Sequence, residues 1–497
     1  MKRFFMPALV AVALVAAPTR AYCAESADTM ALSLREAIDM ARVRSVDAAV
    51  ALDELRTAYW QWRTFRADQL PELAITAKAP AYAKQYSSYM NENGDYSFVR
   101  TNTLQATAEL SVRQNIPLTG GQVSLVSSLD FLRQFDSPAR NRFMSIPVAI
   151  TLEQPLFGTN DMKWERRIEP VRYTEAKAAF LSATEDVART TVDYYFTLLM
   201  SQANVEIAAQ NLENAGQLYA VAQEKRRMGQ ISKNDLLQME LNLLEAQAAL
   251  TDSRSTYKSD MFRLRAFLDL DENTVIVPVV PSAVPHAEVR FADALDKALT
   301  NNKFARSILR RQLEADYEVA RAKGDLREIN LFVQLGYTGT GSEFDAAYSR
   351  LRSNEVASVG FSIPLVDWGK RRGKVKVAES NRRVTESENR RQTMNFNQEL
   401  FILVERLANQ QEQLRLADRS DEIAQRRYLT NVETYMVGAL STLELNDSRL
   451  TKDNARRDYV SQLYKFWQYW YQLRSLTLHD FSTGSDINAD FDRLLRM

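Results

Sequence analysis

Two stretches of this sequence resemble each other and decide how the chain is expected to fold. The first, residues 226–241, reads RRMGQISKNDLLQMEL, and the second, residues 435–450, reads YMVGALSTLELNDSRL. Their matches lie 209 residues apart: Gly229 with Gly438, Ile231 with Leu440, Ser232 with Ser441, Asp235 with Glu444 and Leu236 with Leu445. Glycine reaches positive φ at a helix C-terminus and serine caps a following helix, so each stretch predicts a turn between two helices.

The repeat extends along most of the chain. Further matches at the same offset pair Pro155 with Pro364, Leu198 with Leu407 and Tyr219 with Tyr428. Upstream, LREAIDMA from Leu34 matches FADALDKA from Phe291 at an offset of 257. The change of offset predicts an insertion in the first copy, between Ile75 and Pro155. Self-similarity over such distances indicates a duplicated structural unit.

The duplication divides the chain into segments. A first repeat covers residues 25–268, a linker 269–290, a second repeat 291–478 and a tail 479–497. Each repeat reads as helix, strands, very long helix, glycine turn and return helix. The long helices are expected over about 160–225 and 370–434, and a helix of this length spans roughly 100 Å.

Apolar residues recur every seventh position in the long helices. Leu198, Val205, Leu212 and Tyr219 follow this spacing, and LVERLANQQEQLRLA from Leu403 repeats it. Such spacing buries a narrow seam against other helices. On its own, this periodicity favours a simple coiled-coil spacer, and the segments between the long helices argue against that interpretation.

The segments between the helices alternate between apolar and polar residues. LQATAELSVR from Leu104 alternates throughout, and similar segments begin near Leu73, Gln122 and Ile146 in the first copy. The second copy has room for two strands, around Leu331 and Val359. Two-faced strands of about ten residues fit the wall of a transmembrane barrel with a wet lumen, although a soluble sandwich also alternates.

Two observations favour the barrel over the sandwich. Aromatic residues gather at strand ends and loops, as a membrane-interface girdle requires; they are Tyr82, Tyr86, Tyr89, Phe98, Phe143, Phe157, Tyr337, Tyr348 and Trp368. One chain also has too few strands to close a barrel, which implies an oligomer.

The N-terminus and the composition narrow the function further. Lys2 and Arg3, an apolar run over residues 4–17 and small residues up to Ala24 predict a signal peptide over residues 1–24, so the protein is exported. The only cysteine, Cys23, lies near the expected cleavage site, which leaves no disulfide framework. With 63 basic and 63 acidic residues, nothing indicates a nucleic-acid partner. No later stretch has the ~18 to 20 apolar residues of a membrane-spanning helix, so any crossing would use strands.

With these features together, the chain resembles the TolC-like outer membrane efflux proteins from Leu32 to Leu478. The resemblance rests on the duplicated helix starts, the QPLF and IPLVDWG segments that lead from strand to long helix, and the two glycine turns. It implies an α+β membrane protein: a homotrimer whose strands form one outer membrane β-barrel, continuous with a long periplasmic α-helical coiled-coil barrel. The linker and the tail would form a small equatorial domain.

The resemblance also implies a function. Such proteins are the exit duct of a tripartite efflux pump or a type I secretion system, and they conduct cargo passively. The implied partners are a periplasmic adaptor, an inner-membrane transporter reached through the adaptor, and outer membrane lipid.

The resemblance assigns roles to residues at the two glycine turns. The adaptor-docking turns would be Gly229, Gln230, Ile231 and Ser232 in the first copy, and Gly438, Ala439, Leu440 and Ser441 in the second. Glu444 and Asp447 would form a ring of carboxylates at a periplasmic constriction; a solvated helix face is the competing interpretation. Asp235 and Tyr435 match the latch of the closed gate, but Leu440 replaces the arginine that completes this latch in the family.

Other classes of protein fit the sequence less well. The two histidines, His286 and His479, lie in the linker and the tail, and no catalytic constellation, metal-ligand spacing or cofactor motif is present, so an enzyme is not expected. The main alternative is a non-conducting periplasmic coiled-coil scaffold or adaptor. It explains the heptads and the export signal but not a duplicated strand-and-helix unit.

Overall fold

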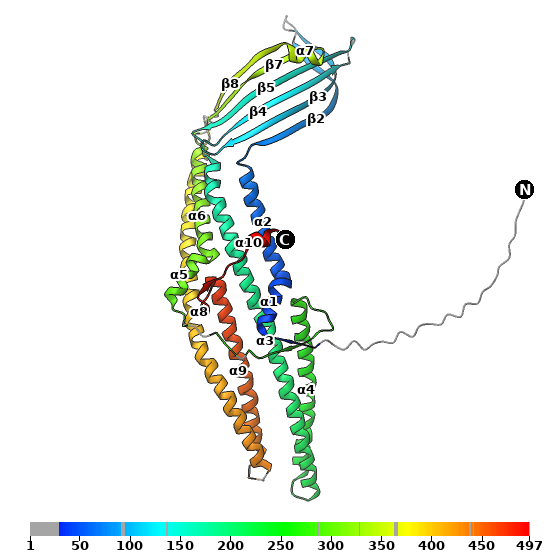
Figure 1. The fold of residues 1–497 in the computed structure, drawn as a ribbon, viewed down its shortest axis with the longest axis vertical. Coiled ribbons are helices and arrows are strands. Elements are labelled where there is room, and N and C mark those ends of the chain that lie inside the picture. Colours follow the sequence, from blue (N-terminus) through cyan, green and yellow to red (C-terminus); the bar gives the residue numbers. More distant parts are fainter. Residues whose placement is uncertain are drawn as a thin grey trace, which may run out of the picture.

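The computed structural model describes residues 29–90, 95–135, 138–281, 283–285, 288–327, 329–361, 366–436, 439–440 and 442–496. The expected signal peptide and Cys23 lie outside these ranges. Figure 1 shows an elongated molecule with a sheet at one end and helices over the rest of its length. Two helical hairpins form the other end. The α+β fold expected from the sequence is confirmed.

The elements follow a similar order in the two halves of the chain, but the first half has two more described sheet strands and the second has the extra helix α7. The first half contains β1 (Thr29–Leu32), α1 (Leu34–Arg44), α2 (Val46–Ala67), β2 (Glu72–Met90), β3 (Tyr96–Ile116), β4 (Gly121–Gln134), β5 (Arg140–Leu156), α3 (Asp161–Arg227) and α4 (Lys233–Phe267). The second contains β6 (Val275–Pro278), α5 (Phe291–Asn301), α6 (Lys303–Gly324), β7 (Ile329–Gly341), α7 (Phe344–Ser349), β8 (Leu351–Phe361), α8 (Lys370–Met436) and α9 (Thr442–Thr477). The tail adds β9 (His479–Asp480), β10 (Ser485–Asp486) and α10 (Phe491–Arg496).

Six described strands form one antiparallel sheet in the order β2-β3-β4-β5-β7-β8. The predicted four strands in the first half and two in the second are confirmed. Three of them are longer than the alternation indicated: β2 has 19 residues, β3 begins at Tyr96 rather than Leu104, and β8 begins at Leu351. The alternation of apolar and polar residues is weaker in these parts of the strands, but the backbone hydrogen bonds between the strands continue through them.

The two faces of the sheet differ in polarity. One register row places Leu73, Val112, Leu125, Ile150 and Leu335 side by side on one face. Ile150 and Leu335 are 52% and 54% exposed, so this apolar face is uncovered in the single chain. The opposite face is polar; there the Thr107 hydroxyl donates a hydrogen bond to the Asp130 carboxylate at 2.5 Å. The alternation of side chains along a strand produces this separation.

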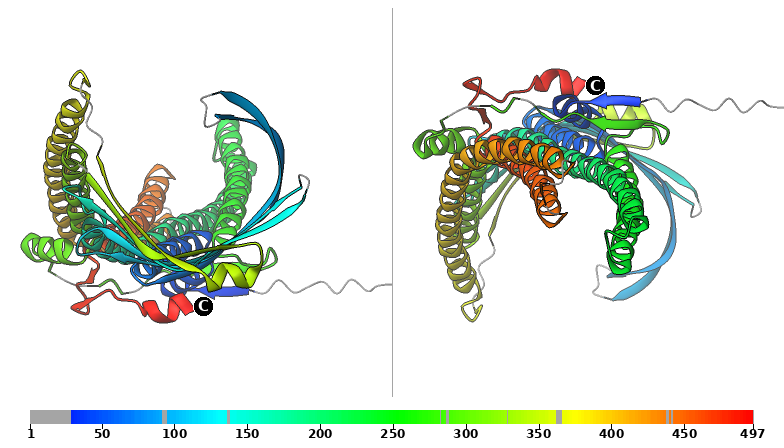
Figure 2. Two further views of the ribbon diagram at one scale, coloured as in Figure 1. Left: turned by 90° about the horizontal axis from the view of Figure 1, so that it is seen from above. Right: turned by 90° about the horizontal axis from the view of Figure 1, so that it is seen from below.

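The long helices form a curved layer below the sheet. α3 and α8 have 67 residues each, close to the predicted bounds, and α4 and α9 have 35 and 36. Near the sheet the contacts run α2–α3–α6–α8, and near the tips they run α4–α3–α9–α8. Figure 2 shows that sheet and helices share one curve with a concave side, and that β1, α10 and the C-terminus lie on the convex side. No helix within the described ranges combines the length and hydropathy that crossing a membrane requires.

The core lies at mid-height, where short elements from both halves meet. β1 and β6 pair in parallel, with Leu32 opposite Pro278. Tyr195 of α3 is fully buried, and its hydroxyl contacts the carbonyl oxygens of Leu32 at 2.8 Å and Val279 at 2.6 Å. Burial raises the pKa of this phenol. A tyrosine therefore ties the long helix to the linker between the two halves.

Candidate functional site at the helix tips

The first tip joins α3 to α4 through a tight hydrogen-bonded turn. Gly229 has φ +73°, the left-handed region that glycine adopts most readily. Its N–H donates to the carbonyl of Arg226 at 3.0 Å, and the N–H of Gln230 donates to the carbonyl of Lys225 at 2.8 Å. These two bonds form a Schellman motif, which satisfies the last carbonyl groups of α3. The glycine therefore ends the helix as the sequence predicted.

Ser232 starts the return helix. Its hydroxyl accepts a hydrogen bond from the N–H of Asp235 at 3.1 Å, and the Asp235 carboxylate accepts bonds from the backbone N–H and the hydroxyl of Ser232 at 3.0 and 2.7 Å. This capping box satisfies free N–H groups at the start of α4. The hydrogen bonds from the Ser232 side chain and backbone hold the pKa of Asp235 below its usual value.

The described part of the second tip shares one backbone hydrogen bond with the first. The N–H of Ala439 donates to the carbonyl of Thr434 at 3.1 Å, which is the Gln230–Lys225 bond shifted by 209 residues. Leu440 is half-buried at the turn. Gly438 and Ser441 lie outside the described residues, as does the side chain of Tyr435. Both tips therefore share the bond that closes the turn.

The predicted carboxylates lie at the start of α9. Glu444 is exposed in the first turn, and Asp447 follows one turn later. The Asp447 carboxylate pairs with the guanidinium of Arg427 on α8 at 2.9 Å, and its side chain is 64% exposed. The structure therefore places a cation beside one of the two acids that the sequence singled out.

A groove lies above the tips between the two hairpins. It has a volume of about 1030 Å³ and is bordered mainly by α3, α4 and α9. Asn214 of α3 donates to the Tyr428 hydroxyl of α8 at 2.9 Å, and Asn211 donates to Asp453 of α9 at 3.0 Å. Polar bridges thus join the hairpins beside this groove.

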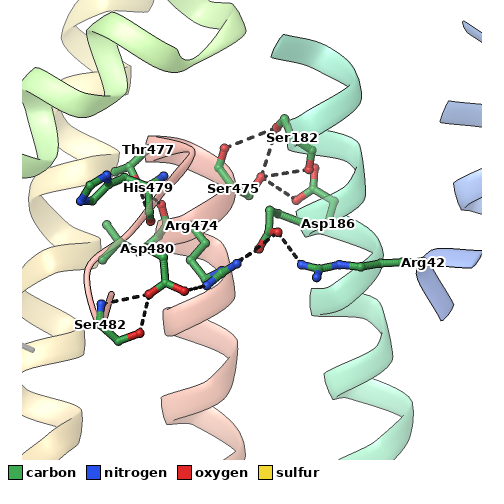
Figure 3. A network of polar contacts seen from close by, with 11 residues as sticks. Arg42, Ser182, Asp186, Arg474, Ser475, Thr477, His479, Asp480 and Ser482 are labelled. Atoms are coloured by element: carbon green, nitrogen blue, oxygen red, sulfur yellow. Dashed lines mark hydrogen bonds and ion pairs between the residues drawn. The ribbon is translucent and has the colours of Figure 1, made fainter. Parts of the chain in front are cut away.

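A network of buried charges fixes the helices at mid-height, as Figure 3 shows. Glu185 of α3 is 1% exposed and pairs with Arg42 of α1 and with Arg474 of α9, the latter at 2.8 Å. Arg474 also binds Asp480 of the tail. Removing one member would leave a buried charge without its partner, which is costly. The network therefore holds α1, α3, α9 and the tail together above the tips.

His479 is buried in the tail, and its Nδ1 lies 2.6 Å from the Asp486 carboxylate. His286 lies outside the described residues. Across the described ranges, no group of three or more potential ligands could hold a metal ion.

A sequence profile described as outer membrane efflux protein matches residues 37–269 and 296–477. The chain belongs to the outer membrane efflux protein family. This confirms the family and the outer membrane location that the sequence predicted, with the helices extending into the periplasm. It also agrees with the expectation that the chain is not an enzyme.

Solved structures share the fold at low sequence identity. The outer membrane channel CmeC of Campylobacter jejuni is 16% identical, with a TM-score of 0.65 over 93% of this chain and 88% of that chain. VceC of Vibrio cholerae is 13% identical, with a TM-score of 0.62 over 92% and 97%. The open state of MtrE of Neisseria gonorrhoeae is 13% identical, with a TM-score of 0.57 over 92% and 91%. No curated protein matches the sequence significantly.

In this family member, the sequence predicts the two helix-to-helix turns but not the side-chain partners of the nearby acids. Arg427 precedes Asp447 by 20 residues, and only the hairpin brings the two together. The pair of Glu185 and Arg474 joins residues 289 positions apart. Neither arrangement leaves a periodic signal in the sequence.

Proposed function

We propose that this chain is a subunit of a homotrimeric exit duct that conducts cargo passively from the periplasm to the exterior. An adaptor docks on its helix tips and links it to an inner-membrane transporter, in a tripartite efflux pump or a type I secretion system. The proposal rests on family membership and, above all, on the geometry of the sheet.

The sheet is amphipathic and open at both edges. Its apolar face suits lipid, but β2 and β8 expose unpaired backbone groups along the described edges. Hydrocarbon does not tolerate such edges, so membrane strands close into a barrel. Three copies would provide about eighteen strands, and barrels of about this number enclose an aqueous channel.

The helices also expose apolar seams for neighbouring copies. Leu237, Leu241 and Leu244 are 52%, 48% and 57% exposed along α4. Leu416 and Ile423, seven residues apart on α8, are 48% and 53% exposed. α4 and α8 form the two flanks of the layer near the tips, so each seam is free to pack against another subunit.

The equal lengths of α3 and α8 support an internal duplication. α1 and α5 also agree at 11 residues, and α2 and α6 at 22. Three duplicated subunits would produce a ring of six similar units. The hairpin β3–β4, which has no counterpart among the described strands of the second half, is the inserted segment.

The two turns are the adaptor-docking surface in this proposal. They are Gly229 to Ser232 and Gly438 to Ser441, and the helices that they join, α3 with α4 and α8 with α9, reach the end of the molecule farthest from the sheet. Glu444 and Asp447 form the constriction behind them. Asp235 and Tyr435 contribute to the closed gate without the arginine that Leu440 replaces, and Asp235 also caps its own helix.

Detergent extraction of the outer membrane tests the trimer. The expected product is a complex that runs as a trimer without heating and as a monomer after boiling. Release of a monomer by osmotic shock, with none in the membrane fraction, would instead support a periplasmic scaffold.

A further inference from the structure

We propose that the sheet-side end of α8 of one copy docks into the groove between α2 and α3 of the next copy. A basic helix face then meets an acidic groove, and this contact closes the helical ring just below the sheet. The inference rests on the trimer proposed above and names the surfaces that hold its copies together.

α2 and α8 are the two flanks of the helical layer near the sheet. Contacts run from α2 to α3, from α3 to α6 and from α6 to α8, and Figure 1 shows α8 and α2 on opposite sides of the layer. The sheet ends in the same way, with β8 above α8 and β2 above α2. A head-to-tail ring of identical copies brings such opposite flanks together.

The exposed face of α8 is basic and carries two apolar side chains. Residues 370–383 include seven basic residues and one acid. Lys370 and Lys374 are exposed, and within the described ranges neither takes part in an ion pair. Val377 and Val384, seven residues apart, are 60% and 53% exposed. This face is free to meet another surface.

The opposite face of α8 packs against α6. Val375 is buried, and Arg382 lies 3.7 Å from Asp316 of α6. In a helix with 3.6 residues per turn, Val377 and Val384 point away from Val375. The internal contact with α6 therefore leaves the Val377 face uncovered.

The facing groove on α2 and α3 has the complementary character. It has a volume of about 770 Å³, and its ten described lining residues include four acids, Asp53, Asp68, Glu165 and Glu169. Arg56, the one cation among these ten, already pairs with Asp53 at 3.1 Å. Trp60 also lines the groove and is 59% exposed. An incoming helix would need cations and small apolar side chains, as α8 has.

Among the acids of the groove, Glu165 lies in an unfavourable position for its charge, whereas Glu169 pairs with Arg172 at 2.5 Å. Burial and the nearby carboxylates of Asp161, Glu169 and Asp68 raise the pKa of Glu165. A cation from a neighbouring copy would relieve this repulsion.

The levels of the two surfaces agree. Glu165 is the fifth residue of α3, and Lys374 is the fifth residue of α8. Both helices start directly below the sheet, so these side chains lie at the same depth in a ring of copies. α2 and α6 are each 22 residues long, and Trp60 and Asp316 occupy nearly the same position along them. Arg382 of α8 pairs with Asp316, so this part of α8 lies at the level of Trp60 in the proposed ring. Val384 is therefore expected beside the neighbour's Trp60.

Cysteine cross-linking tests this contact in isolated outer membranes. The variant carries Trp60→Cys and Val384→Cys in the full chain, with Cys23→Ser to exclude the native thiol. Mild oxidation should produce disulfide-linked dimers and trimers on a non-reducing gel. The matched control combines Trp60→Cys with Glu379→Cys, because Glu379 faces Lys323 of α6 at 3.2 Å, and should remain uncrosslinked.

Charge reversal provides a second, independent measurement. Lys374→Glu should lower the temperature at which the trimer dissociates in detergent, and adding Glu165→Lys should restore it. A trimer that forms normally, is not cross-linked through residues 60 and 384 and is unaffected by Lys374→Glu would overturn this docking while leaving the duct intact. Absence of any trimer from the unmodified chain would instead refute the proposed function.

Discussion

At the level of residues, the chemistry at the tips is less uniformly acidic than the sequence indicated. The Asp447 carboxylate forms an ion pair with Arg427, and the Asp235 carboxylate accepts a hydrogen bond from the Ser232 hydroxyl. Sequence reasoning could place these acids near the turns, because the 209-residue repeat fixes their position relative to the glycines. It did not reveal the Arg427 partner, because that contact depends on how two helices are rotated against each other.

Replacing Glu444 and Asp447 with alanine should reduce the cation selectivity of the reconstituted channel. The change removes two carboxylates per subunit from the proposed constriction, and acidic rings attract cations. Reversal potentials under a salt gradient in planar bilayers measure the effect.

Arg427→Ala is the matched control for the carboxylate ring. It removes the cation beside Asp447 and leaves both acids, so cation selectivity should rise. Selectivity that stays the same in both variants would show that these carboxylates do not face the passage.

At the level of elements, the long helices and the sheet were predictable, but the short elements were not. Seven-residue spacing and glycine turns set the bounds of α3 and α8 to within about two residues of the structure. The parallel pair β1–β6 has four residues per strand and depends on Tyr195, which lies far away in sequence. The position of α7 likewise depends on close packing against β7, where only a glycine fits. A Cβ at Gly339 would lie 1.9 Å from the carbonyl oxygen of Ala347.

Gly229→Arg should abolish most transport while leaving the trimer intact. Arginine at φ +73° strains the turn and adds a bulky charge to the proposed docking surface. Accumulation of a pump substrate in cells that depend on this duct measures transport.

Gly216→Arg is the control for the tip variant. Gly216 lies inside α3, and at both glycines a Cβ would meet no described neighbouring atom within 4 Å, so the two sites differ in backbone conformation and location. The control should retain transport. Full transport by Gly229→Arg would refute adaptor docking at this tip.

At the level of the whole molecule, one chain forms a curved layer whose shape suits a sector of the proposed tube. The curved sheet continues into a curved helical layer, and both end in open flanks. The hydrophobic core and the buried network around Glu185 lie midway along the molecule. They hold the helices of the curved layer together and leave its two flanks uncovered. The sequence predicted this plan through its duplication, but the flanks became visible only with the strand order and the helix contacts.

Closure of several copies into a conducting ring in the outer membrane is the property on which the proposed function depends. Single-channel recording of the purified protein in lipid bilayers, combined with sizing of the same particles, is the decisive experiment. We expect discrete conductance steps from a particle that contains three chains. Silent bilayers, together with sizing that shows a single chain, would rule the ring out.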